Sequence, residues 1–171
     1  DLHAAYEVVK DFKEPAAVVI KHNNPTGVAV AETLAAAYKD AHRCDPVSAF
    51  GGIIGLNKKV DAQTADLIIK SGFMECVIAP GFDRPALKML CTKKNLRVIQ
   101  LKMNSLESLE YAFKQVDGGM LVQQKDGKRI SLKDLKVVTK KKLTAAQMDS
   151  LLFGWNVIRH IRSNAIMLVK G

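Results

Sequence analysis

The order of apolar and polar positions predicts a chain in which helices alternate with short buried strands. Apolar residues that recur three and four positions apart are typical of helices, and short continuous β-branched runs are typical of buried strands. The expected helices are 2–13, 31–43, 61–70 and 84–92, and the expected strands are 16–20, 53–56, 76–80 and 96–100. This alternation predicts an α/β fold with a largely parallel sheet. Between the first strand and the second helix, residues 21–27 are polar and contain Pro and Gly, which predicts a loop.

The alternation becomes weaker after residue 100. Residues 120–123 predict a strand and 125–128 a turn. Thr144 is a capping residue for a long helix that reaches about His160. The apolar run 165–169 predicts another buried strand, and its place at the end of the chain indicates that the parent protein continues past it.

Composition narrows the class of protein. Hydrophobic residues make up 48% and charged residues 25% of the 171 residues, which favours a soluble globular protein over a disordered, collagen-like or coiled-coil one. No apolar run is long enough for a membrane helix, and no signal peptide is recognisable. Cys44, Cys76 and Cys91 are widely spaced and odd in number, which indicates reduced thiols in a cytoplasmic protein and argues against a zinc site.

The positive charge is concentrated in one part of the chain. The net charge is +9, and residues 81–145 account for the whole excess, with 15 Lys or Arg against six Asp or Glu. Such a stretch attracts phosphates, polyanionic small molecules or nucleic acid, and a solvated basic face explains it equally well. Because the basic residues are scattered and aromatic residues are only 6%, we do not expect a nucleic-acid partner.

Lys21 and His22 are the first candidates for chemistry. They follow the strand 16–20, and ligands in open α/β sheets collect at the carboxyl ends of strands. A histidine can accept a proton near neutral pH, and an adjacent lysine can stabilise an oxyanion or hold a phosphate. A surface lysine beside a hydrogen-bonded loop histidine is the structural alternative.

Three further sites are weaker candidates. Residues 48–52 end in two glycines, whose exposed N–H groups can hold an anion or a carboxamide, although a simple turn before a strand explains them too. Asn164 can recognise an amide or a ring nitrogen, or it can merely close an Asx turn. Glu75 can accept a hydrogen bond from a ligand amine, or it can be an exposed residue before a strand.

Two motifs resemble those of the AICAR transformylase family. Residues 21–27 read Lys-His-Asn-Asn-Pro-Thr-Gly and resemble the family's Lys-His-x-Asn-Pro-x-Gly, and residues 45–52 read Asp-Pro-Val-Ser-Ala-Phe-Gly-Gly and resemble its Asp-Pro-x-Ser-Ala-Phe-Gly-Gly. Further matching segments follow in family order at 77–80, 93–97, 118–123, 137–139 and 152–166. The resemblance therefore extends over nearly the whole chain.

This resemblance implies an activity. Such enzymes transfer a formyl group from the co-substrate 10-formyltetrahydrofolate to the exocyclic amine of AICAR, in the synthesis of IMP. The resemblance assigns the general base to His22 and the stabiliser of the transition state to Lys21. It places substrate-binding residues at Asn24, Phe50, Gly51, Glu75 and Asn164. No metal is implied in the site.

The resemblance also implies an architecture. It predicts a cytidine-deaminase-like three-layer sandwich with a mixed, mostly parallel sheet and no zinc, and a homodimeric parent protein. Residues 1–171 correspond to the first part of the transformylase domain, so the cyclohydrolase domain and the second transformylase subdomain are expected outside them. The chain is therefore expected to be inactive alone. A stand-alone purine-nucleotide-binding module that lost catalysis is the alternative.

Overall fold

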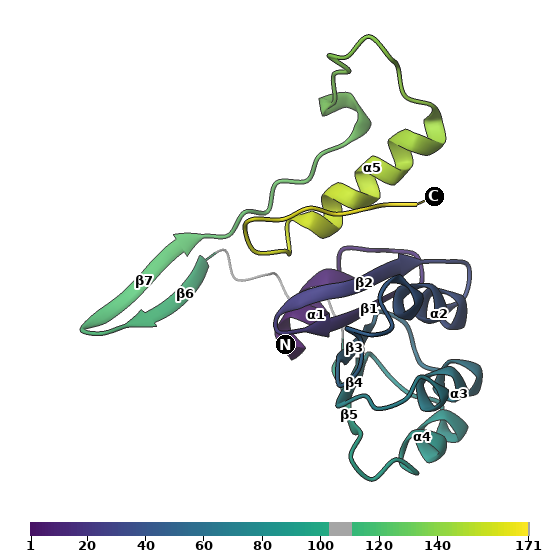
Figure 1. The fold of residues 1–171 in the computed structure, drawn as a ribbon. Helices are drawn as coiled ribbons and strands as arrows, with labels where there is room; N and C mark the ends of the chain where they lie inside the picture. The colour runs from purple at the N-terminus through teal and green to yellow at the C-terminus, as the bar shows by residue number, and fades with distance from the viewer. Residues whose placement is uncertain (103–110, 171) are drawn as a thin grey trace.

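The computed structural model of the chain describes residues 1–102 and 111–170 (Figure 1). Residues 1–102 form a layered unit, here called the body, and residues 111–170 form a more open part, here called the outer segment. The body contains α1 (Leu2–Val9), β1 (Ala16–Lys21), β2 (Asn24–Val30), α2 (Leu34–Cys44), β3 (Ile53–Leu56), α3 (Ala62–Lys70), β4 (Cys76–Ala79), α4 (Arg84–Leu90) and β5 (Arg97–Gln100). The outer segment contains β6 (Tyr111–Val116), β7 (Gly119–Gln124), the 3₁₀ helix η1 (Leu132–Asp134) and α5 (Ala145–Ile158). No described helix is long and apolar enough to cross a membrane.

The body is built on one five-stranded sheet with the order β2-β1-β3-β4-β5. The strand β1 pairs antiparallel with both β2 and β3, whereas β3, β4 and β5 pair in parallel. Four of these five strands therefore point the same way, and β1 points in the opposite direction. This confirms the expected α/β fold with a mixed, mostly parallel sheet.

Helices cover both faces of the sheet, so the body has three layers (Figure 1). Alternate side chains of a strand point to opposite faces, and β1 shows this directly. Its Val19 belongs to the same core as the buried side chains of α2, α3 and α4, whereas Val18 and Ile20 belong to the core formed with α1. The side chains that α1 places on this second face are Ala5, Val8 and Val9, all fully buried.

The predicted loop 21–27 is largely a β-hairpin, so the prediction is wrong for Lys21, which ends β1, and for residues 24–27, which belong to β2. The strand β2 begins at Asn24 and returns antiparallel along β1 through a two-residue turn. Both turn residues have positive φ, 52° at His22 and 63° at Asn23, as tight hairpin turns require. Pro25 is tolerated because β2 is an edge strand. Gly27 suggested a loop, but it is required by packing, since a Cβ there would lie 2.0 Å from the Ala41 carbonyl oxygen of α2.

The other predicted elements of the body are confirmed, with shifted ends. The helix predicted over 2–13 ends at Val9, and the helix predicted over 31–43 begins at Leu34. Thr33 caps that helix by accepting a hydrogen bond from the Ala36 N–H at 3.2 Å. Asp61 caps α3 in the same way, with its carboxylate 2.7 Å from the Thr64 nitrogen.

Two of the elements predicted for the outer segment are confirmed. The strand expected over 120–123 belongs to β7, which forms a hairpin with β6 that projects away from the body (Figure 1). Thr144 begins α5 through a reciprocal pair of hydrogen bonds with Gln147. The predicted turn at 125–128 has no regular secondary structure, although the Lys128 N–H donates to the Asp126 carboxylate at 3.1 Å.

The prediction of a buried strand at 165–169 is wrong. Ile166 and Leu168 are 92% and 95% exposed, and the run pairs with no strand among the described residues. The opposite side of the run lies on α5, where a Cβ added to Gly154 would be 2.9 Å from the Val169 side chain. The alternation of the run therefore places one side on a helix and the other in solvent.

Candidate functional site

Residues singled out from the sequence meet at one edge of the sheet. Lys21 ends β1, Gly51 precedes β3 and Glu75 directly precedes β4. The three strands are in register here, because Ile20 pairs with Ile53 and Ile53 pairs with Cys76. Sequence positions separated by more than 50 residues therefore lie along a single line at this edge.

The direction of β1 changes the reasoning that led to this edge. Lys21 does follow the carboxyl end of its own strand, as expected. Because β1 runs opposite to the rest, however, the same edge carries the amino ends of β2, β3, β4 and β5. The helices α2, α3 and α4 also end at this edge, since each leads into the amino end of the next strand. The rule about carboxyl ends of parallel strands thus applies to Lys21 alone.

Lys21 joins the two matching motifs. Its Nζ donates a hydrogen bond to the Phe50 carbonyl oxygen. Gly51 follows with a φ of 68°, and its N–H donates to the Phe73 carbonyl oxygen at 2.8 Å. The Gly52 N–H donates to the Ala49 carbonyl oxygen at 2.9 Å, so the prediction that these two N–H groups are free to hold an anion is wrong. A Cβ on Gly51 would lie 3.3 Å from Lys21 Nζ, so both the backbone conformation and the close approach favour glycine.

The loop that carries Phe50 and Gly51 is held by its own polar contacts. The Asp45 carboxylate accepts a hydrogen bond from the Ser48 N–H at 2.9 Å. Hydrogen bonds from Ser48 lower the pKa of Asp45 below its usual value. The Asp-Pro-Val-Ser part of the motif therefore has a local structural role, which is to shape the turn before Phe50.

The hairpin turn presents His22 to solvent, and Asn24 links this turn to the outer segment. Among the described residues, the His22 ring makes no hydrogen bond. The Asn24 amide donates to the His22 carbonyl oxygen at 3.3 Å, and its oxygen accepts from the Arg162 N–H at 3.4 Å. Asn164, two residues further on, is exposed and accepts a hydrogen bond from the Ser163 hydroxyl at 2.8 Å.

Glu75 lies beside a small cavity that the sequence did not reveal. This cavity, about 320 Å³ in volume, is lined by Phe73, Glu75, Lys94, Asn95, Leu96 and Arg97. The Glu75 carboxylate is 3.9 Å from the Arg97 guanidinium, and both side chains are more than half exposed. The Phe73 ring lies 5.6 Å from the Phe50 ring, centroid to centroid.

Sequence reasoning assigned no site role to Phe73 or to residues 94–97, which line this cavity with Glu75, although 93–97 is one of the segments that match the family. Arg97 could have been found from the sequence, because it lies at the start of the expected strand 96–100, and Glu75 lies directly before the neighbouring expected strand 76–80. No pattern in the sequence pointed to Phe73.

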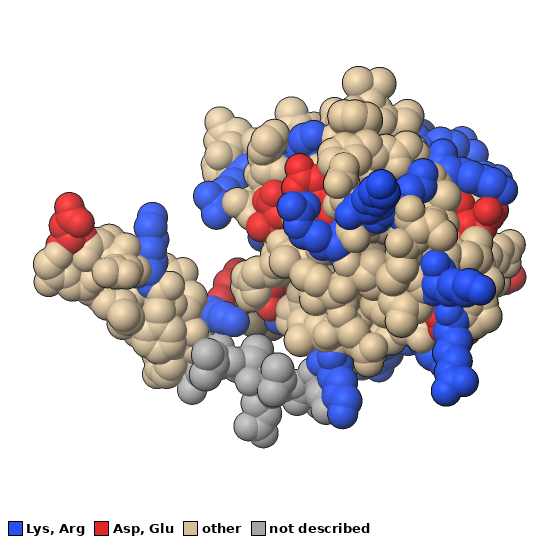
Figure 2. Space-filling model, turned by 90° about the horizontal axis from the view of Figure 1, so that it is seen from below, with Lys and Arg blue, Asp and Glu red and all other residues tan. Residues whose placement is uncertain are grey.

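The basic stretch contributes only partly to this edge. Lys94 and Arg97 line the cavity. On the face shown in Figure 2, the Lys and Arg side chains are spread over the molecule rather than gathered in one patch. No three His, Cys, Asp or Glu side chains of residues 1–102 and 111–170 gather in a way that could hold a metal ion.

Comparison with known proteins identifies the family. The model of the family described as AICARFT/IMPCHase bienzyme matches residues 1–171. The chain belongs to this family. It is 50% identical over 170 residues to the bifunctional purine biosynthesis protein PurH of Thermoanaerobacter sp. (strain X514). Proteins of the same name from Caldicellulosiruptor saccharolyticus (strain ATCC 43494 / DSM 8903 / Tp8T 6331) and Oceanobacillus iheyensis (strain DSM 14371 / CIP 107618 / JCM 11309 / KCTC 3954 / HTE831) are 47% and 44% identical over 170 residues.

The chain spans only part of these AICARFT/IMPCHase relatives. Each alignment covers 99% of this chain and 33% of the relative. The family resemblance inferred from the motifs is thus confirmed. The roles of the individual site residues are not tested by these comparisons.

Proposed function

We propose that this chain forms part of an enzyme of purine biosynthesis and that it contributes to formyl transfer from 10-formyltetrahydrofolate to AICAR. The bifunctional purine biosynthesis proteins that it resembles support the role in the pathway. The observation that carries the finer proposal is the hydrogen bond from Lys21 to the Phe50 carbonyl oxygen, next to Gly51. It brings the Lys-His pair and the Ser-Ala-Phe-Gly-Gly segment, far apart in sequence, to one place.

The residue types at this edge suit acyl transfer. The AICAR amine attacks the formyl carbon, a new C–N bond forms, and the bond from that carbon to the folate nitrogen breaks. His22 takes the proton that the amine loses, and the departing folate nitrogen gains a proton in exchange. Lys21 stabilises the negative charge that develops on the formyl oxygen.

The groups around Lys21 and His22 bind AICAR. Glu75 presents an exposed carboxylate able to accept from an amine. The Gly51 N–H is engaged by the Phe73 carbonyl oxygen, so Gly51 contributes the close approach of a ligand to the loop rather than a free N–H. Asn24 supplies an amide group from the hairpin and Asn164 one from the outer segment, two residues after Arg162, whose N–H donates to the Asn24 oxygen. Phe50 contributes an exposed ring for contact with a flat ligand.

The proposal extends to architecture and assembly. The three layers and the mixed sheet support a cytidine-deaminase-like fold. A homodimeric, cytoplasmic parent protein stays a prediction, as does the assignment of the chain to the first part of the transformylase domain.

A chimeric enzyme tests the proposal. The matching third of the Thermoanaerobacter PurH would be replaced by this chain, and formyl transfer to AICAR would be measured together with AICAR binding. We expect an active chimera. We expect His22→Ala to lower turnover by about a hundredfold or more while AICAR still binds, because only the proton acceptor is removed.

The matched control for His22→Ala is His3→Ala, which removes an exposed histidine of α1 whose side chain makes no hydrogen bond among the described residues. Because Asp1, two residues earlier, accepts from the Asn23 N–H of the turn, this control lies close to the same turn, and we expect it to leave turnover unchanged. Turnover that survives His22→Ala would overturn the assignment of the base. Binding of AICAR by the isolated chain, together with a chimera that never transfers formyl groups, would favour the nucleotide-binding module instead.

A further inference from the structure

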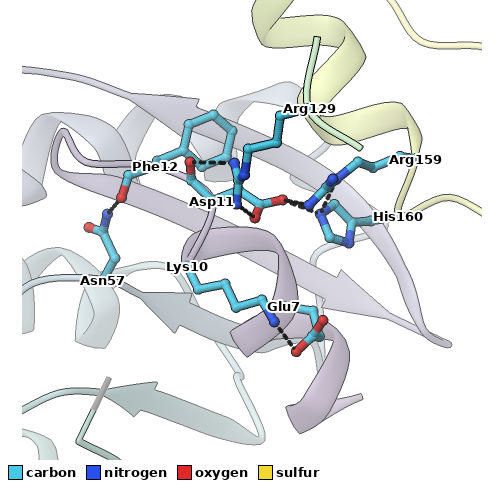
Figure 3. A network of polar contacts seen from close by, with 8 residues as sticks. All are labelled: Glu7, Lys10, Asp11, Phe12, Asn57, Arg129, Arg159 and His160. Atoms are coloured by element: carbon cyan, nitrogen blue, oxygen red, sulfur yellow. Dashed lines mark hydrogen bonds and ion pairs between the residues drawn. The ribbon is translucent and has the colours of Figure 1, made fainter. Parts of the chain in front are cut away.

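A buried carboxylate lies where the outer segment meets the body. The Asp11 side chain, just after α1, is 0% exposed and contacts three cationic or basic groups of the outer segment (Figure 3). Its oxygens lie 2.6 Å from Arg129 Nη2, 2.5 Å from Arg159 Nη2 and 2.8 Å from His160 Nε2. Burial acts to raise the pKa of Asp11, but the hydrogen bond with His160 and the charges of Arg159 and Arg129 outweigh it and lower the pKa to about 2.

The backbone next to Asp11 is fixed to the body on its other side. The Asn57 amide donates to the Phe12 carbonyl oxygen at 2.9 Å and to the Glu14 carbonyl oxygen at 2.7 Å. The Asn57 oxygen accepts from the Ala16 N–H, where β1 begins, at 2.8 Å. Asp11 is therefore attached to the sheet through a short loop with defined hydrogen bonds (Figure 3).

Few other contacts hold the outer segment in place. Every ion pair that the described residues form between the body and the outer segment ends on Asp11. The Phe12 and Phe153 rings add an apolar contact, with centroids 5.4 Å apart. A groove of about 520 Å³ separates part of α5 and the end of the chain from β2 and α2, so packing there is incomplete.

Two of the residues that bind Asp11, Arg159 and His160, come shortly before residues of the candidate site in the sequence. The helix α5 ends at Ile158, and Arg159 and His160 follow it at once. Arg162, two residues after His160, donates its N–H to the Asn24 side chain. Asn164 lies two residues after Arg162. An anchor at residues 159–160 thus restricts where Asn164 can lie relative to the turn at His22.

We propose that Asp11 is a positioning residue of the candidate site, whose carboxylate fixes the end of α5 and thereby places Asn164 beside the hairpin turn. The inference rests on the proposed function, in which Asn164 contacts AICAR. A buried carboxylate with charge-assisted hydrogen bonds is well suited to such a role, because loss of its charge leaves Arg159 and His160 without their common partner.

The test uses Asp11→Asn, with Glu7→Gln as the matched control. Glu7 is also an acidic residue of the α1 region, but its partner is Lys10 in the same region and it does not reach the outer segment (Figure 3). Residue-resolved hydrogen exchange would be measured on the chain, and AICAR affinity by calorimetry. In Asp11→Asn we expect the Arg162 amide to exchange about tenfold faster or more, and AICAR to bind about tenfold more weakly. Glu7→Gln should change neither quantity.

A double variant separates positioning from a general loss of stability. If Asp11 acts through Asn164, then Asp11→Asn combined with Asn164→Ala binds AICAR no more weakly than Asn164→Ala alone. Independent, additive losses would overturn the inference, and so would an unchanged Arg162 amide in Asp11→Asn. Asp11→Glu, which keeps the charge, should restore most of the affinity.

Two further outcomes are distinguishable. If Asp11→Asn also increases exchange in β1 and β3, then Arg159→Gln replaces it, because Arg159 lies outside the body and its removal leaves the core intact. If the unmodified chain does not bind AICAR, the affinities of the same variants are measured in the chimera, because the proposed function concerns the chain as part of a longer enzyme. The exchange of the Arg162 amide still tests the positioning role in the isolated chain.

Discussion

The body and the outer segment contain similar kinds of apolar runs but bury them very differently. In the body, two clusters of side chains on opposite faces of the sheet are buried almost completely. In the outer segment, Gly154 and Val157 are the buried positions among the described residues. The β6–β7 hairpin exposes large apolar side chains along both strands. The comparison shows that an apolar run forms a core only where the chain also supplies a second layer to cover it.

The largest effect we predict compares two leucines, one from each region. Leu56 of β3 is fully buried, whereas Leu168 is 95% exposed. Leu56→Ala should lower the free energy of unfolding by about 2–5 kcal/mol, because a methyl-lined cavity replaces packed atoms. Leu168→Ala should change it by less than about 0.5 kcal/mol. Urea unfolding followed by far-ultraviolet circular dichroism measures both, and equal effects would mean that the two regions share one core.

A smaller effect concerns the anchor between the two regions. The pKa of Asp11 is lowered from 3.8 to about 2, so its ionised form favours the anchored state by about 2 kcal/mol. Because the folded pKa is the lower one, this contribution is complete above about pH 4 and is lost as the pH falls from about 4 towards 2.

Trp155 lies in α5 and is the sole tryptophan of the chain, so its fluorescence reports on the outer segment. In urea, we expect Asp11→Asn to move the Trp155 transition to lower concentration at pH 7 and to have almost no effect near pH 2. A difference between the two proteins that persists unchanged at pH 2 would contradict the assigned ionisation.

The smallest effect concerns the capping of α5. Thr144→Ala removes the hydrogen bond to the Gln147 N–H and should destabilise α5 by about 1 kcal/mol. Thr33→Ala removes the equivalent cap of α2 in the body. We expect the Trp155 signal to respond to Thr144→Ala and not to Thr33→Ala. A response to both would indicate that the two regions unfold together.

The body was predictable from the sequence because local and tertiary preferences agree there. Continuous β-branched runs such as the one ending at Ile20 marked every strand of the body except β2, and Asp61 marked the start of α3. The strand β2 was missed since its Pro and Gly are local signals for a loop. Their presence is explained only by its edge position and by the close packing of Gly27 on α2.

The candidate site was only partly predictable. Motifs identified Lys21, Gly51 and Glu75, and strand register then brought them into line. The role of Asp11 had no local signal, because its partners lie more than 100 residues away in the chain. The exposure of residues 165–169 could not be predicted either, because an apolar pattern in the sequence does not show which other part of the protein will cover it.

The reversed direction of β1 also sets the electrostatic character of the candidate site. The helices α2, α3 and α4 all end at that edge, so their partially negative carbonyl ends, rather than their amino ends, lie on that side of the sheet. The amino ends of α2, α3 and α4, of the kind that commonly binds phosphate, lie at the opposite edge. The helix α1 does begin beside the hairpin turn, but there the Asp1 carboxylate already accepts a hydrogen bond from the Asn23 N–H at 2.6 Å. An anionic ligand at this edge must therefore be held by side-chain cations such as Lys21 and Lys94, and we expect its affinity to fall as the salt concentration rises.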